Sequence, residues 1–203
     1  MKAESQKIFN ELWEDVVWLN GKWNIVNQLF YSDPCNIELL NRKAFSFFRV
    51  IKRTLLDDIL LSICRIIDPD VSFKGDENCS LNNLIATLDE EEDKLIIEKL
   101  NNLIKDSEKN IQTIKKIRDK KLAHKDLKIA LSNNEESQLS INQIRDVIQI
   151  ITKFMNSYQS NFERKETAYE NFEFNTNGKT IIEYLKQSDK YLEIEKQKIS
   201  HLK

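Results

Sequence analysis

Glycine and proline are scarce in this chain, which has 203 residues but only 3 glycines and 2 prolines. Folds rich in tight turns need many more of both, because these residues supply the backbone angles of turns. The scarcity therefore excludes a turn-rich β fold and favours an all-α fold. It also excludes a glycine-rich phosphate-binding loop, which three glycines could hardly build.

Cysteine and long apolar runs are limited too. The three cysteines, Cys35, Cys64 and Cys79, are odd in number and lack metal-ligand spacing, so we expect a reducing compartment and no metal site. Cys64 lies in an apolar run and is predicted to be buried and unreactive. No apolar run approaches the roughly 18 residues of a membrane span, and the N-terminus lacks an apolar signal stretch. We therefore expect a cytoplasmic protein with no membrane segment and no cofactor.

The residues that are abundant suit a packed helical protein. The hydrophobic share is 40% and the charged share 32%, which fits long helices with a buried face and a solvated face. The net charge is −2, so the whole protein is not a polycation that coats nucleic acid. Any contact with nucleic acid must come from a local basic patch.

Apolar residues recur every three or four positions along most of the chain, which predicts amphipathic helices. The first predicted helix has an apolar stripe along one face, which runs from Ile8 to Phe30. Asp33 and Pro34 cap and open the second helix, which runs to Ile67 and holds Phe45 and Phe48 in a middle predicted to be central in the bundle.

The sequence predicts the starts of four further helices. Ser80 caps a short helix, and Asp89 opens a long one that ends near Arg118. Ser140 with Gln143 forms a capping box, as does Thr180 with Glu183. The sequence therefore predicts an all-α, up-and-down bundle of four to five main helices over residues 1–163, with a helical extension over residues 164–203 that packs on the bundle or on a partner.

Arg118 and His124 are the strongest candidates for chemistry. An arginine can fork onto phosphate oxygens, and a histidine can carry a proton near neutral pH. These two abilities suffice to cleave RNA without a metal ion: a base takes the proton of the ribose 2′-OH, which attacks the neighbouring phosphorus while a cation stabilises the charge. Basic residues surround the pair and form a patch for RNA, above all Lys115, Lys120, Lys121 and Lys125.

The spacing of the pair is awkward for one straight helix, because positions 118 and 124 lie roughly 120° apart on a helical wheel. Either the helix bends or ends between them, or the site forms between two copies of the protein. A structural interpretation also stands: basic residues at a helix C-terminus compensate the helix dipole, and a histidine there can cap carbonyl groups.

The string Arg118-Asp-Lys-Lys-Leu-Ala-His124 resembles the R-x(4–6)-H motif of HEPN domains, and Ile117 to Asp126 resembles the abortive-infection U type of that family. Leu55 to Pro69, which ends in Arg-x-x-Asp-Pro, is similar to that group's second helix, and Leu12 to Phe30 is similar to its first. Only the last thirty or so residues match loosely.

This resemblance implies a HEPN helical bundle, a homodimer with the site at its interface, and metal-independent endoribonuclease activity in phage defence or a toxin–antitoxin pair. It implies that Arg118 and His124 are catalytic and that Asp119 is the supporting polar residue. Some HEPN proteins only bind partners, so the alternative is a non-catalytic module for RNA, an antitoxin or a nucleotidyltransferase. A helical interaction protein with no RNA role is a third interpretation.

Two more residues are candidates for supporting the site. Arg65 either reaches the cleft and holds a phosphate or pairs with Asp119 or Asp126, and we favour the structural role. Asp126 either orients the imidazole of His124 or caps a turn. Asp68, at the end of the second helix, is predicted only to end that helix.

Overall fold

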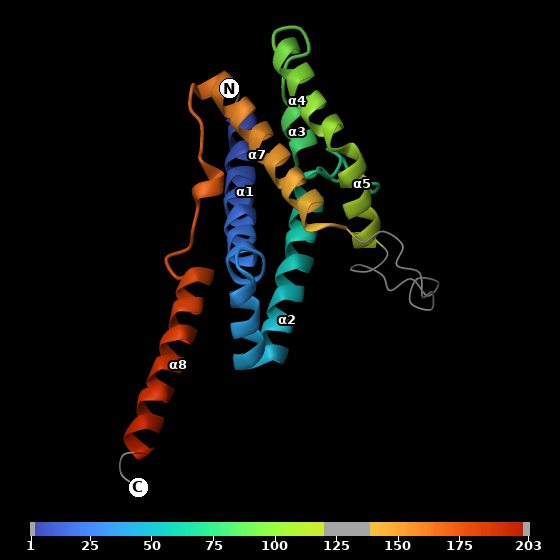
Figure 1. Cartoon of the computed structure of the whole chain (residues 1–203). Coiled ribbons are helices and arrows are strands. Elements are labelled where there is room, and N and C mark those ends of the chain that lie inside the picture. Colours follow the sequence, from blue (N-terminus) through green and yellow to red (C-terminus); the bar gives the residue numbers. More distant parts are fainter. Residues whose placement is uncertain (1–2, 120–138, 201–203) are drawn as a thin grey trace, which may run out of the picture. The chain divides into compact units, whose positions relative to one another are not determined.

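The computed structural model describes residues 3–119 and 139–200, and the described chain is almost entirely helical. The helices are α1 (Ala3–Phe30), α2 (Pro34–Ile66), α3 (Leu81–Ala86), α4 (Lys94–Asp106), α5 (Glu108–Ile117), α7 (Ile141–Glu163) and α8 (Gly178–Ser200), with a 3₁₀ turn at Tyr169–Asn171 (Figure 1). Within these residues the only β pairing is an isolated bridge between Val71 and Glu77. The predicted all-α bundle is confirmed.

The described chain forms two compact units. The first unit comprises Met1–Asn20 and Asp57–Tyr169, and the second comprises Gly21–Leu56 and Glu170–Lys203. Both α1 and α2 contribute to both units. The predicted division of the chain at residue 163 stays a prediction.

The first unit has a dense apolar core. Its fully buried side chains come from α1, the end of α2, α3, α4, α5 and α7, and include Leu12, Leu19, Ile59, Ile63, Leu84, Leu100, Ile114, Phe154 and Tyr158. These positions repeat every three or four residues along each helix, as the sequence pattern predicts. Helix α7 packs along α4 and α5 and closes this core.

The second unit fastens α8 to α1 and α2 with polar contacts. Asp189 of α8 accepts a hydrogen bond from Arg42 at 2.6 Å, and it forms ion pairs with Arg42 and with Lys43, whose Nζ also lies 2.6 Å away. The backbone N–H of Gly178 donates to the Gln28 side chain at 2.9 Å. These contacts tie the start and the middle of α8 to the other helices of this unit.

Several helix starts match the sequence. Asp33 accepts from the backbone N–H of Cys35 at 2.9 Å, and Pro34 opens α2. Ser80 caps α3, and Ser140 with Gln143 forms the full capping box of α7. Each cap satisfies backbone N–H groups that have no partner inside the helix.

Two helix starts are wrong. The residue that caps α8 is Asn177, whose side chain accepts from the backbone N–H of Thr180 at 3.2 Å, so Thr180 already lies inside the helix. The helix predicted to open at Asp89 begins at Lys94 instead. The Asp89 carboxylate accepts from the N–H groups of Glu91 and Glu92 and holds the intervening residues in turns.

Two interruptions also depart from the prediction. The long helix ending near Arg118 is divided at Ser107 into α4 and α5, because Ser107 leaves the helical angles (φ −107°, ψ 8°). Helix α2 is kinked at Ala44, where φ is −160° and ψ 65°. Beyond the kink, Phe48 is buried as predicted, but Phe45 and its neighbour Phe47 are 52% and 59% exposed. The middle of α2 is therefore buried on one side only, and its predicted central position is wrong for Phe45.

Within residues 3–119 and 139–200, no helix has both the length and the apolar character that crossing a bilayer would require.

Candidate functional site

Arg118 directly follows the last residue of α5, in the first unit. The α-helix ends at Ile117, and Arg118 and Asp119 continue in a π-helical turn. Turns of this kind are rare and often occur at functional sites. The predicted bend or end of the helix between Arg118 and His124 falls beyond Asp119, outside the described residues, and stays a prediction.

Two carboxylates hold the Arg118 guanidinium from different elements. Its Nη1 donates to both oxygens of Asp68, at 3.0 and 3.3 Å, and its Nε donates to Asp119 at 2.8 Å. Asp68 lies just after α2, so the pair joins segments fifty residues apart. The side chains of Arg118 and Asp68 are 25% and 27% exposed, so neither member of the pair is fully buried.

Lys115 lies one helical turn before Arg118 and joins the same cluster. Its Nζ donates to the backbone carbonyl of Ile67 at 3.2 Å and lies 3.7 Å from Asp68. The ammonium group thus caps the C-terminal end of α2, where the helix dipole favours positive charge. Its predicted role in RNA binding stays a prediction, beside this structural one.

The electrostatics of the cluster keep Arg118 charged. Burial lowers the pKa of the guanidinium, but the hydrogen bonds to Asp119 and Asp68 outweigh that effect, so the pKa is raised overall. A permanent cation is thus fixed at the end of α5 by two anions. Its neighbour Cys64 is fully buried, as predicted, and burial is the main reason why the pKa of its thiol rises to about 11. Cys64 is therefore a neutral, buried thiol close enough to Arg118 for the two to interact electrostatically.

The predicted site residues divide into three groups. Arg118, Asp119 and Lys115 come together as described above. Arg65 is exposed in the last turn of α2, and Asp119 pairs with Arg118 instead of with Arg65. The other five lie outside the described residues: His124, Lys120, Lys121, Lys125 and Asp126.

Asp68 is the residue that sequence reasoning missed. The sequence predicted only that it ends α2, whereas its carboxylate holds Arg118 from a distant segment, with two contacts to Nη1. One signal could have found it: the Arg-x-x-Asp-Pro ending of the second helix, at positions 65–69, was already part of the family resemblance.

The fold is an all-α bundle, and Arg118, just after α5, begins an R-x(5)-H motif in the sequence. Together these two features are typical of the HEPN class of domains. The particular family is given by a family model described as AbiU2, HEPN_AbiU2, which matches residues 2–178. The chain belongs to this family, and the resemblance stated from the sequence is confirmed. No curated protein and no solved structure gives a significant match.

Proposed function

We propose that this protein is a metal-independent endoribonuclease of the HEPN type that acts in abortive infection. In this proposal His124 takes the proton of a ribose 2′-OH, the 2′-oxygen attacks the adjacent phosphorus, and the 5′-oxygen leaves with a proton. The products are a 2′,3′-cyclic phosphate and a 5′-hydroxyl end. Arg118 binds the scissile phosphate and stabilises the charge that develops on it.

The observation that carries the proposal is the way in which Arg118 is held. Asp68 and Asp119 occupy its Nη1 and Nε, while among the described residues none bonds to Nη2. A phosphate oxygen can therefore bind to Nη2 while both carboxylates keep the guanidinium in place. A group fixed before the substrate arrives costs no reorganisation during the reaction.

The remaining parts of the proposal concern assembly and setting. A homodimer would let the site combine Arg118 and His124 of two copies, which resolves their awkward spacing on one helix. Lys115, Lys120, Lys121 and Lys125 would attract the RNA backbone, and Arg65 and Asp126 would support the site. The protein would act in the cytoplasm, in phage defence or with an antitoxin.

One observation favours a second function, that of a non-catalytic HEPN module that binds RNA or a partner such as a nucleotidyltransferase. Arg118 already has two carboxylate partners, which together compensate more than its single charge. Such a pairing weakens the attraction of the arginine for phosphate and is common in arginines that only stabilise a fold. In that case the fold and the basic patch remain, but no RNA is cut.

Cleavage of RNA in excess EDTA separates the two functions. We compare wild type with Arg118→Ala and His124→Ala, and use Arg49→Ala, an exposed arginine of α2 in the second unit, as a matched control. The proposal predicts cleavage by wild type and Arg49→Ala, cyclic phosphate ends, and a loss of about a hundredfold or more in the other two variants.

The second function predicts that no protein in this set cuts RNA above background, although all of them fold. Activity that disappears with EDTA, or that survives in both Arg118→Ala and His124→Ala, would rule out the proposed mechanism. Circular dichroism of each variant distinguishes a lost site from a lost fold.

A further inference from the structure

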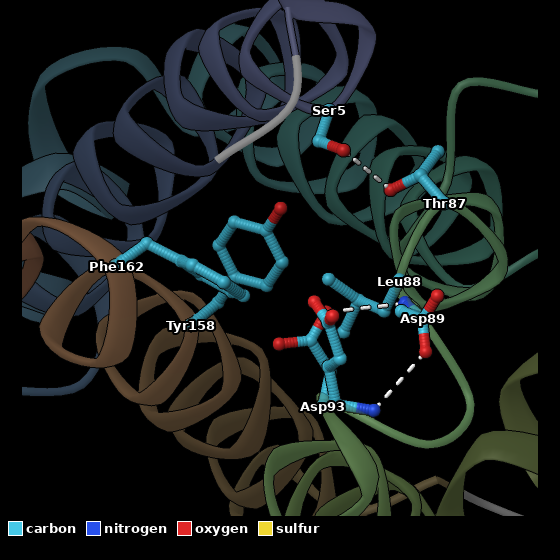
Figure 2. A pocket seen from close by; sticks show the side chains of 8 residues that line it. Ser5, Thr87, Leu88, Asp89, Asp93, Tyr158 and Phe162 are labelled. Atoms are coloured by element: carbon cyan, nitrogen blue, oxygen red, sulfur yellow. Dashed lines mark hydrogen bonds between the residues drawn. The ribbon is translucent and has the colours of Figure 1, made fainter.

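A cavity lies in the first unit and is lined by none of the residues of the Arg118 cluster. It has a volume of about 320 Å³ and opens between the start of α1, the segment between α3 and α4, and the end of α7 (Figure 2). Pockets that bind small molecules have volumes of about 300 to 1,000 Å³, so it can hold a small ligand or one long side chain.

One wall of this cavity is acidic. Asp89, Glu92 and Asp93 line it, and among the described residues that do so none is basic. Backbone groups fix two of these carboxylates: Asp89 accepts from the N–H groups of Glu91 and Glu92 at 3.0 Å each, and Asp93 accepts from that of Asp89 at 3.1 Å. A concave surface with a single sign of charge concentrates the field and attracts cations.

A buried hydroxyl on the opposite side points to a ligand independently. Tyr158 is 0% exposed, and its hydroxyl lies near those of Ser5 and Thr87 without forming a well-aligned hydrogen bond to them or to any other described residue. Its ring stacks on that of Phe9, with the ring centroids 5.5 Å apart, and packs against that of Phe162, with the centroids 4.8 Å apart. These two contacts hold the ring in its position. Figure 2 shows the side chains of Tyr158 and Asp93 pointing into the same space. Buried hydroxyls are nearly always paired, so this one lacks a partner that the cavity can admit.

The rest of the rim adds further oxygen atoms. Ser5 Oγ donates to Thr87 Oγ1 at 2.8 Å, and Thr87 Oγ1 donates to the carbonyl of Leu84 at 2.8 Å. Both hydroxyl protons are thus used within the protein.

We propose that this cavity binds the ammonium group of a primary alkylamine. An ammonium group has three N–H donors, and the cavity is lined by carboxylate, phenol and hydroxyl oxygens that can accept them. Phe162 would pack against the alkyl chain and its cation. The amine is either a free diamine or the side chain of a lysine in a polypeptide, and both present the same group.

Isothermal titration calorimetry of the full chain at constant ionic strength tests the proposal. The probes are 1,4-diaminobutane and N-acetyl-lysine amide, and 1,4-butanediol is the neutral control of similar shape. We expect one amine per chain and no heat from the diol. Tighter binding of the diamine identifies a free amine as the ligand, and tighter binding of the blocked lysine identifies a polypeptide.

Variants locate the binding. Glu92→Gln and Asp93→Asn should each weaken it about tenfold, because each removes a charged hydrogen-bond acceptor. Glu98→Gln, which changes an exposed glutamate of α4 that does not line the cavity, should leave the affinity unchanged. Glu92 is exposed, so Glu92→Gln tests the site even if other variants fail to fold.

Three results would overturn the proposal: no binding of either amine at millimolar concentration, equal binding of the diol, or equal losses in Glu98→Gln and Glu92→Gln. Displacement of the amine by Mg²⁺ at unchanged ionic strength would also overturn it, in favour of a metal-ion site.

Discussion

Replacing Asp68 with asparagine should detach Arg118 while leaving the bundle folded. The change keeps the shape of the side chain but removes the charge that faces Nη1 at 3.0 Å and the Lys115 ammonium at 3.7 Å. Among the described residues, Arg118 then keeps only Asp119, its neighbour in sequence, as an anionic partner. The guanidinium should therefore sample several positions at the end of α5.

The expected loss of stability is small. A hydrogen bond to a charged group contributes about 1.5–3 kcal/mol, and a neutral one about 1 kcal/mol. Both side chains are roughly a quarter exposed, which favours the low end of the range. We expect Asp68→Asn to lower the free energy of unfolding by about 1 kcal/mol and the melting temperature by about 2–4 °C. A double-mutant cycle with Arg118→Met should give a coupling energy of about 1 kcal/mol.

The expected loss of activity is larger than the loss of stability, and it should appear in kcat alone. Misplacing a phosphate-binding group should lower kcat for RNA cleavage about ten- to a hundredfold. The local charge becomes one unit more positive, so KM for RNA should not rise. Asp70→Asn makes the same change of charge at an exposed position two residues away and should leave kcat unchanged.

Steady-state cleavage of one short RNA by these variants tests this reasoning. An unchanged kcat in Asp68→Asn would refute the idea that Asp68 positions Arg118. So would a rise in KM at constant kcat, because that pattern would mean that Asp68 acts only on binding. An equal loss of kcat in Asp70→Asn would attribute the effect to charge alone.

Three other predictions concern stability. Burial raises the pKa of the Cys64 thiol from 9.0 to about 11, so the contribution of this thiol to the free energy of unfolding is fully present below pH 9. The difference in unfolding free energy between wild type and Cys64→Ala should therefore shrink as the pH rises from 9 towards 11. A difference that does not change with pH would contradict this. Ser140→Ala removes the cap of α7 and should cost about 1 kcal/mol in chemical denaturation, whereas the exposed Ser160→Ala should cost much less. Gly21→Ala would place a Cβ 2.7 Å from the ring of Phe174, so it should destabilise the protein by about 1–3 kcal/mol despite the better helix propensity of alanine; a higher melting temperature would show that the ring moves aside at little cost.

The helices could be predicted because each carries a local signal. An apolar stripe fixes which residues face the core, and a cap such as Ser140 with Gln143 needs only neighbouring residues. Where two capping signals compete, sequence cannot decide: Thr180 satisfies the pattern, but Asn177 lies earlier and forms the cap. The kink at Ala44 carries no glycine or proline signal, and beyond it Phe45, which the sequence placed inside, is exposed.

The candidate site could be predicted only in part. The residue types and the family motif identified Arg118, but the anchor Asp68 lies fifty residues away in the sequence and is brought close only by the fold. Local patterns carry no information on such a pair. The acidic cavity shows the same limit, because Tyr158 and Asp93 follow separate helical patterns and only the fold brings them together.

The most direct test of the ribonuclease account is a single-turnover cleavage rate in excess EDTA, on one RNA and on the same RNA with a 2′-deoxyribose at the cleaved position. The account predicts that wild type cuts only the all-ribose strand, and that Arg118→Ala cuts neither strand at an appreciable rate. Cleavage of the deoxy-substituted strand, or an Arg118→Ala rate equal to that of wild type, would contradict it.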